Sequence, residues 1–371
     1  MNKWTYTTLG KISEIITGPF GSQLHQSDYV EQGIPVVMPQ DIDNRKVNYA
    51  SINYVSNEDA IRLERYKTII NDILYARRGD VEKHAFIKEK DNGVLCGTGC
   101  LRVRITTSEV EPEFISFFLN REETRKWLVT HAVGTNMPNL NTDILSDVPI
   151  AYPLLEEQRR IVQVLNSLDE KIALNSAVND NLSAMAYDIY MHNFFSKKPN
   201  AKLKDILTEA EKSAIQVGEA KTSNGEYPFF TSGATILKWI EPFVDGRNCF
   251  LNTGGNADVK FYVGKAAYST DTWSISAKSE MSDYLYLMLF SIKPELDQKF
   301  FQGTGLKHLQ KPLLKDRPIY VPEKLELEAF NRQVMPMFDI ISENTRENQQ
   351  LTSLRDWLLP MLMNGQAIIS D

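Results

Sequence analysis

The sequence predicts an α+β protein in which two similar α/β modules are separated by two long helices. The first observation is an internal repeat: at an offset of 169 residues, segment 134–153 matches segment 303–322 at eight of 20 positions. Chance gives roughly one identity in twenty positions. The second observation is that a heptad-patterned segment follows each copy. A unit this long indicates a duplicated domain rather than a solenoid, whose units are shorter. The identical residues are Gly134, Thr135, Leu140, Leu145, Asp147, Pro149, Ile150 and Pro153.

Residues 1–154 form the first predicted module. Short β-rich segments bounded by turn residues occur at 34–38, 73–76 and 101–105. Residues 113–129 have helical apolar spacing. A short strand is expected at 148–152, just before Pro153.

The second predicted module, residues 198–322, repeats this order of segments. Residues 202–206 correspond to 8–12, and the apolar helix 284–292 corresponds to 114–119. The offset falls from 194 residues at the front to 169 at the back, so the first copy carries about 25 extra residues in its interior. Matching ends with different interiors predict one scaffold that carries two different binding surfaces.

The segments 155–197 and 323–371 are predicted to be long helices that pair as a coiled coil. Their apolar positions step alternately by four and three residues, and Asn175, Asn179, Asn344 and Asn348 occupy matching positions. A buried asparagine costs stability but fixes register, so these residues are expected to align the pair. The alternative is two independent amphipathic helices, each packed on its own module. Pro336 predicts either a kink or a helix that begins there.

Composition indicates an ordinary globular chain. Of the 371 residues, 42% are hydrophobic and 24% are charged, and no apolar run is long enough to span a membrane. No signal-peptide core follows Met1, and three cysteines favour a reducing, cytoplasmic location. Cys96 and Cys100 have no second ligand pair nearby, so no zinc site is expected.

The charge distribution does not decide whether the chain binds nucleic acid. The net charge is −7, whereas nucleic-acid-binding domains usually carry a basic surface. Residues 61–104 contain ten Lys or Arg and six Asp or Glu, a local excess of four positive charges. This excess fits either a DNA-binding cleft or a solvated surface.

Catalytic and metal-binding motifs are absent from the sequence. No P-loop, complete dinucleotide fingerprint or HExxH pattern occurs, and the five histidines lack a triad-like context. No Pro-Pro pair is present, which excludes the Asn/Asp-Pro-Pro-Tyr/Phe motif of amino-methyltransferases. Residues 253–258 could cradle a phosphate, but a tight turn between strands is expected. We therefore predict no catalytic and no metal-binding residues.

One segment resembles a known family. Residues 139–141, together with the run 147–161 (DVPIAYPLLEEQRRI), resemble the end of a recognition domain in the specificity subunits of type I restriction–modification systems. The resemblance covers essentially the whole chain. The second copy departs from it, because segment 321–326 lacks the Glu-Gln-Arg-Arg run. Residues 250–273 also resemble a common recognition-domain type, although the histidine that often follows Thr270-Asp271 is missing.

The resemblance implies a DNA-reading scaffold without its own catalysis. Each recognition domain would read one half of a bipartite double-stranded DNA target, and the paired helices would set the gap and dock two methyltransferase (M) subunits. Restriction (R) subunits would join that complex, and S-adenosylmethionine and ATP would belong to these partners. The seam from Ile161 to Ile189 is about 42 Å long at about 1.5 Å per residue, somewhat more than one DNA turn of roughly 34–36 Å. The length therefore suits a bipartite site whose halves lie about a turn apart.

Base reading needs Arg or Lys toward guanine and Asn or Gln toward adenine. Each candidate taken singly is more often a solvated side chain or a phosphate contact, and Phe229, Phe230 and Trp239 are expected in the core. The first-module candidates are Gln40, Arg77, Arg78, Lys83, His84, Asn136, Asn139 and Asn141. The second-module candidates are Lys238, Arg247, Asn252, Asn256, Lys260, Lys265, Lys307 and His308.

Two other function classes remain open at this level. The chain could be a coiled-coil scaffold for protein interactions, or a DNA-modifying enzyme with divergent motifs. Failure to bind DNA even with partner subunits would support the scaffold, and methyl transfer by the isolated chain would support the enzyme. Duplication with divergent interiors favours DNA recognition, because two DNA half-sites are alike in shape and different in sequence.

Overall fold

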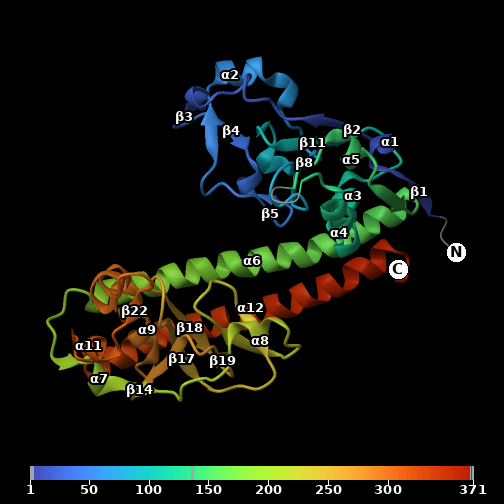
Figure 1. Cartoon of the computed structure of the whole chain (residues 1–371). Coiled ribbons are helices and arrows are strands. Elements are labelled where there is room, and N and C mark those ends of the chain that lie inside the picture. The colour runs from blue at the N-terminus through green and yellow to red at the C-terminus, as the bar shows by residue number, and fades with distance from the viewer. Residues whose placement is uncertain (1–3, 135–137, 368, 370–371) are drawn as a thin grey trace. The chain divides into compact units, whose positions relative to one another are not determined.

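The computed structural model describes residues 4–134, 138–367 and 369. Contacts divide the chain into two compact units, one formed by residues 1–169 with 353–371 and the other by residues 170–352. Each unit therefore contains one globular module and a part of each long helix (Figure 1).

The first module is built on a four-stranded antiparallel sheet of order β2-β11-β8-β9. Side chains alternate across this sheet: Ile73 and Tyr75 enter one apolar cluster, and Leu74 and Ala76 enter another. Both faces are covered, which explains why β8 is a continuous apolar run. The strands are β2 (Ser13–Thr17), β8 (Ile73–Ala76), β9 (His84–Phe86) and β11 (Cys100–Ile105).

A second sheet and several helices complete this module. The sheet has the order β10-β4-β7-β3, with β10 parallel to β4, and a separate antiparallel pair joins β1 to β12. The expected helix over 113–129 is two helices, because the chain turns at Arg121. The elements are β1 (Thr5–Thr8), α1 (Leu9–Ile12), β3 (Tyr29–Val30), β4 (Ile34–Val37), β7 (Asn53–Val55), β10 (Leu95–Cys96), α3 (Pro112–Leu119), α4 (Glu122–His131), α5 (Thr142–Ser146) and β12 (Pro149–Tyr152).

The second module repeats this topology. Its main sheet has the order β14-β20-β17-β18, its smaller sheet has the order β16-β15-β19 with β19 parallel to β15, and β13 pairs with β23. The elements are β13 (Ala201–Lys202), α7 (Leu203–Ile206), β14 (Leu207–Glu209), α8 (Val217–Lys221), β15 (Tyr227–Phe230), β16 (Leu237–Trp239), β17 (Arg247–Asn252), β18 (Val259–Val263), β19 (Ala267–Tyr268), β20 (Thr272–Ala277), α9 (Ser282–Ser291), α11 (Lys311–Lys315) and β23 (Pro318–Ile319). Shared strand order, including the parallel pair, confirms the duplication.

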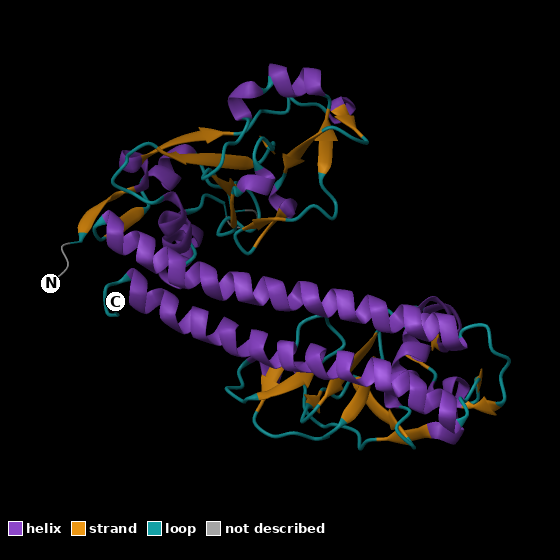
Figure 2. Ribbon diagram, turned by 180° about the vertical axis from the view of Figure 1, so that it is seen from behind, coloured by secondary structure: helices purple, strands orange, loops and turns teal. Residues whose placement is uncertain are grey.

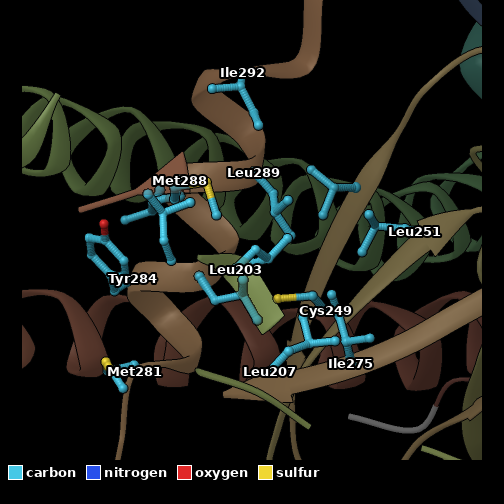
Figure 3. Close-up of a cluster of buried hydrophobic side chains, with 14 of the residues drawn as sticks. Leu203, Leu207, Cys249, Leu251, Ile275, Met281, Tyr284, Met288, Leu289 and Ile292 are labelled. Carbon is cyan, nitrogen blue, oxygen red and sulfur yellow. The ribbon is translucent and has the colours of Figure 1, made fainter. Parts of the chain in front are cut away.

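The core of the second module lies between its main sheet and α9. Leu251 and Ile275 from the sheet belong to the same buried apolar cluster as Tyr284, Met288 and other α9 side chains (Figure 3). Phe229 and Phe230 are also buried, as expected for core aromatics.

The modules differ most in one connection. Residues 38–72, between β4 and β8, contain β5 (Ile42–Asp43), β6 (Lys46–Val47), β7 and α2 (Asn57–Arg62). The equivalent residues 231–246, between β15 and β17, contain only β16 among helices and strands. Most of the extra residues of the first copy therefore lie in this connection.

The two long helices, α6 (Leu155–Phe194) and α12 (Lys324–Met363), pair in an antiparallel orientation (Figure 2). Asn175 Nδ2 donates to Asn348 Oδ1 at 2.9 Å, and Asn344 Nδ2 donates to Asn179 Oδ1 at 2.8 Å. The predicted pairing and its asparagine contacts are confirmed, and the alternative of independent helices is wrong. Each asparagine meets the non-equivalent asparagine of the other copy, as an antiparallel pair requires.

Each long helix packs against both modules, with its N-terminal part against the module that precedes it in sequence and its C-terminal part against the other. Ile161 and Leu165 of α6 enter the first-module core, and Phe330 and Val334 of α12 enter the second. The expectation that a helix begins at Pro336 is wrong, because α12 begins at Lys324 and continues through the proline. Packing against the module outweighs the cost of about 3 kcal/mol of an interior proline.

Cys96, Cys100 and Cys249 are buried free thiols. Within the described residues, no group of three or more His, Cys, Asp or Glu side chains is placed to hold a metal ion. In the same part of the chain, no helix combines the length and apolar character needed to cross a membrane.

Candidate nucleic-acid interface

The repeated loop docks in the same way in both modules. In the first, Leu140 N donates to Arg77 O at 2.9 Å and Gly79 N donates to Pro138 O at 3.3 Å. These bonds join the loop before α5 to the turn that leaves β8. The turn and the loop therefore form one continuous surface, which we call the paired-loop edge of the first module (residues 77–80 and 138–141).

The second module contains the same arrangement. Leu309 N donates to Thr253 O at 3.0 Å, and Gly255 N donates to Lys307 O at 2.9 Å. Its paired-loop edge consists of residues 253–258, the predicted turn between β17 and β18, and residues 306–309. A β-bridge joins Arg78 to Asn139 in the first edge and Gly254 to His308 in the second. Asn139 and His308 are 169 residues apart, so different side chains occupy one position of the repeat.

Four candidates lie on the first edge. Arg78 is exposed, and within the described residues no ion pair or side-chain hydrogen bond holds its guanidinium group. Arg77 and Asn139 are half-buried, and Arg77 Nε and Asn139 Oδ1 have no hydrogen-bond partner in the described part of the chain. Asn141 caps α5, since its Oδ1 accepts from Ile144 N at 2.7 Å. Asn136 lies outside the described residues.

The second edge presents amide, imidazole and ammonium groups. Asn256 and His308 are exposed, and Lys307 Nζ lies 2.9 Å from Asp297 Oδ2. Asn252 and Lys260 lie behind this edge and support neighbouring backbone. Asn252 Nδ2 donates to Ser232 O at 3.1 Å and to Asn256 O at 3.0 Å, so that side chain is already occupied.

The remaining surface candidates lie apart from the paired loops. Lys260 Nζ donates to Thr231 O at 2.6 Å, which holds the segment after β15. Gln40 is exposed after β4, and Lys265 is exposed between β18 and β19. Lys238 is half-buried on β16. Lys83 Nζ is 2.9 Å from Asp80 Oδ2.

His84 is buried, contrary to a role in DNA contact. His84 is only 2% exposed, and its Nε2 lies 3.0 Å from Ser116 O. The ring stacks on Tyr75 at 5.0 Å between centroids. Burial lowers the pKa of His84 to about 3, so the imidazole is neutral at pH 7. The neutral imidazole ring packs in the core, so the prediction that His84 contacts DNA is wrong.

Arg247 is likewise committed to the protein. Its Nε lies 2.6 Å from Asp283 Oδ2, its Nη1 lies 2.6 Å from Asp339 Oδ1, and its Nη2 donates to Met335 O at 2.8 Å. The Asp283 side chain is fully buried. This guanidinium group therefore ties β17 to α9 and α12 rather than facing DNA.

Sequence reasoning missed the equivalent group in the first module, Arg45. It has a φ of 61° in the turn between β5 and β6, which directs its side chain inward. The guanidinium group lies 3.4 Å from Glu113 Oε1, 3.3 Å from Asp169 Oδ2 and 3.4 Å from the ring centroid of Phe117. Burial lowers the pKa of Arg45 to about 10, so it stays charged at pH 7. Its partners come from α3 and α6, far apart in sequence.

The basic segment 61–104 is less positive in space than in sequence. Several of its cations form ion pairs, and acidic side chains from outside the segment supply the partners of three of them. The ion pairs are Arg62 with Asp28 and Asp59, Lys88 with Glu113, Arg102 with Glu14, and Arg104 with Asp72. Arg78 on the paired-loop edge is an exposed cation without an ion pair among the described residues.

Comparisons with known proteins agree with this arrangement. A family model described as the type I restriction modification DNA specificity domain matches residues 1–184 and 197–352. The chain is 24% identical to the HindI specificity subunit of Haemophilus influenzae, covering 99% of this chain and all of that protein. It is 21% identical to the MjaIX specificity subunit of Methanocaldococcus jannaschii, covering 99% and 94%.

A solved structure shares the fold. The S subunit of a type I restriction–modification system from M. genitalium superposes with a TM-score of 0.65 at 16% identity, covering 98% of this chain and 96% of that one. Two family matches coincide with two modules that carry the same paired-loop edge. The chain therefore belongs to the type I restriction–modification DNA specificity family and is a DNA target-recognition subunit with two copies of its domain.

Proposed function

We propose that the chain is the non-catalytic sequence-reading subunit of a type I restriction–modification complex, in which each paired-loop edge contacts one half of a bipartite DNA target. The observation that carries this proposal is the equivalence of the two edges. Identical backbone hydrogen bonds build them, and different side chains occupy them. One scaffold with two sets of donors suits two half-sites that share the shape of B-DNA and differ in sequence.

The proposed contacts are exposed or half-buried candidates whose side chains, apart from that of Lys307, form no ion pair among the described residues. In the first module we retain Gln40, Arg77, Arg78 and Asn139, and in the second Asn256, Lys265, Lys307 and His308. The arginines and lysines can bind phosphates or guanine, and the amides can pair with adenine. Lys307 would have to exchange its partner Asp297 for DNA, so a smaller net gain is expected there.

The helix pair is proposed to set the gap between half-sites and to dock M subunits. Exposed apolar side chains on both helices support docking, since each would gain stability if a partner covered it. These residues are Leu174 and Met185 on α6 and Leu354 and Trp357 on α12, each 42–60% exposed. Two M subunits are proposed, joined by R subunits in the cytoplasm. S-adenosylmethionine and ATP are proposed to bind these partners.

Methylation mapping tests the proposal. The full chain is co-expressed with its cognate methyltransferase subunit in a host that lacks both, and methylated adenines are mapped across the genome. We expect one new motif with two short halves and a fixed gap. Expression of the methyltransferase subunit alone is the control and should give no motif. An intact complex that methylates nothing, or a motif without two halves, would contradict the proposal.

A further inference from the structure

We propose that Phe20 makes an apolar contact with a base in the half-site read by the first module. This inference rests on the proposed function and adds to it a base contact that polar-residue reasoning does not find. Phe20 lies in the turn Gly18-Pro19-Phe20-Gly21, which follows β2.

The exposure of Phe20 is unusual within its module. Phe20 is 58% exposed, whereas the other four phenylalanines of residues 1–154 are at most 4% exposed. Those residues are Phe86, Phe114, Phe117 and Phe118. A phenylalanine gains stability by burial, so an exposed one gives up this gain in the free protein.

Hydrogen bonds hold the backbone of this turn in place. Gly18 N donates to Cys100 O at 2.9 Å, and a Cβ atom at Gly18 would lie 2.2 Å from Gly97 O. The turn is therefore packed directly on the backbone of a neighbouring loop, where a side chain has no room.

Gln23 braces the other side of the turn. Its Oε1 accepts from Phe20 N at 3.2 Å and from Tyr66 Oη at 2.9 Å, and Gln23 N donates to Phe20 O at 2.8 Å. The ring is thus carried by a backbone anchored at both ends. A rigidly presented aromatic group loses little conformational entropy on binding.

Phe20 adjoins the first paired-loop edge. The Arg77 guanidinium carbon lies 6.0 Å from the ring centroid, and Arg77 N donates to Gly99 O at 2.8 Å. Buried polar atoms without partners in the described residues gather on the same loops: Arg77 Nε, Thr98 Oγ1 and Asn139 Oδ1. An exposed apolar ring beside an arginine and an asparagine matches the major groove of DNA, which offers base edges, phosphates and the apolar methyl group of thymine together.

The second module has no aromatic residue at the position that corresponds to Phe20. The segment that follows β14 begins Ala210-Glu211-Lys212-Ser213 and carries no aromatic residue before Tyr227. The apolar side chain near its edge is Leu306, which is 65% exposed. We therefore expect the contribution of Phe20 to be confined to one half-site.

The test measures the affinity of the complex of the full chain and its methyltransferase subunit for a duplex that carries the mapped target. Phe20→Ala should weaken binding about tenfold, the order expected when one apolar side chain is no longer buried on binding. The slope of log affinity against log salt should stay unchanged, because no phosphate contact is lost. Arg78→Ala should instead reduce that slope by about 0.9 if it binds one phosphate. Tyr6→Ala removes an aromatic residue that is 80% exposed on β1 and should have no effect.

The outcomes distinguish failure of the proposed Phe20 contact from failure of the proposed function. A Phe20→Ala complex that binds within twofold of the wild type, or loses affinity equally on a scrambled duplex, overturns the inference and leaves the proposed function intact. A reduced melting temperature that accounts for the lost binding also overturns it. A wild-type complex that does not prefer its mapped target overturns both. Base substitutions should alter the effect of Phe20→Ala in one half-site only.

Discussion

The two modules build their paired-loop edges on the same backbone arrangement and differ in the side chains that these edges carry. The same pair of backbone hydrogen bonds docks the repeated loop at residues 138–140 and at 307–309. At the equivalent position, the first edge carries Asn139 and the second carries His308. This scaffold can stay fixed while the groups on its edge vary, because backbone bonds do not depend on side-chain identity.

Attachment to the long helices follows a similar pattern with different residues. Arg45 reaches Glu113 and Asp169 from a turn, while Arg247 reaches Asp283 and Asp339 from a strand. Both guanidinium groups join an acid on the module's own helix to an acid on a long helix. The two arginines come from unrelated positions of the repeat, so the function of the contact is shared even though its residues are not.

The largest expected effect is the loss of Arg247. Arg247→Ala leaves the Asp283 carboxylate buried without its partner and should lower the free energy of unfolding by about 3–5 kcal/mol. Arg45→Ala should have an effect of similar sign in the first module. Urea unfolding measures both, with exposed Arg78→Ala as the control. A loss below about 1 kcal/mol for Arg247→Ala would show that this arginine does not secure its module.

The seam asparagines should show strong coupling. Asn175→Leu places an apolar side chain against Asn348 and Glu347 and should cost about 2 kcal/mol. The double variant Asn175→Leu with Asn348→Leu should recover that loss, because an apolar pair replaces a polar one. A double-mutant cycle in urea measures the coupling. Additive costs would indicate that the two asparagines do not act as a pair.

Edge substitutions should affect DNA binding and not folding. Arg77→Ala should weaken binding to the target by about 1–2 kcal/mol, and Lys307→Ala should have a smaller effect because Lys307 already pairs with Asp297. Fluorescence anisotropy with the intact complex measures the affinity, and a melting curve checks the fold. Unchanged affinity for Arg77→Ala at physiological salt would remove this residue from the proposed contacts.

The pH dependence of stability should reveal the buried histidine. The folded pKa of His84 is about 3, below its usual value near 6.5, so between these pH values the unfolded chain binds a proton that the folded chain does not. Its contribution is full above pH 6.5 and is lost as the pH falls. Between pH 7 and 5.5 the wild type should lose about 1 kcal/mol more than His84→Gln. Parallel losses in urea titrations would contradict a neutral buried imidazole.

Much of the fold could be predicted from the sequence because it rests on local patterns. The apolar strand at 73–76, the repeated segments 134–153 and 303–322, and the seam asparagines all carry period or repeat signals. The antiparallel direction of the helix pair could not be predicted from the sequence, because it depends on which asparagines contact each other in the folded protein. The break at Arg121 was also missed, since apolar spacing continues across it.

The candidate site was harder to predict, because residue type does not reveal burial. His84 and Arg247 have the chemistry of DNA readers, but their partners Ser116, Asp283 and Asp339 lie far away in sequence. Phe20 was missed for the opposite reason, since aromatic residues are usually core. A phenylalanine between Gly-Pro and Gly at a turn was the available signal.

The most direct test of the central claim is methylation mapping with complexes that carry Asn139→Ala or His308→Ala. These residues occupy one position of the repeat in two different edges. If each edge reads one half-site, each variant should relax the motif in one half only, and the two variants should relax opposite halves. Changes in both halves from a single substitution, or in the same half from both, would contradict the account.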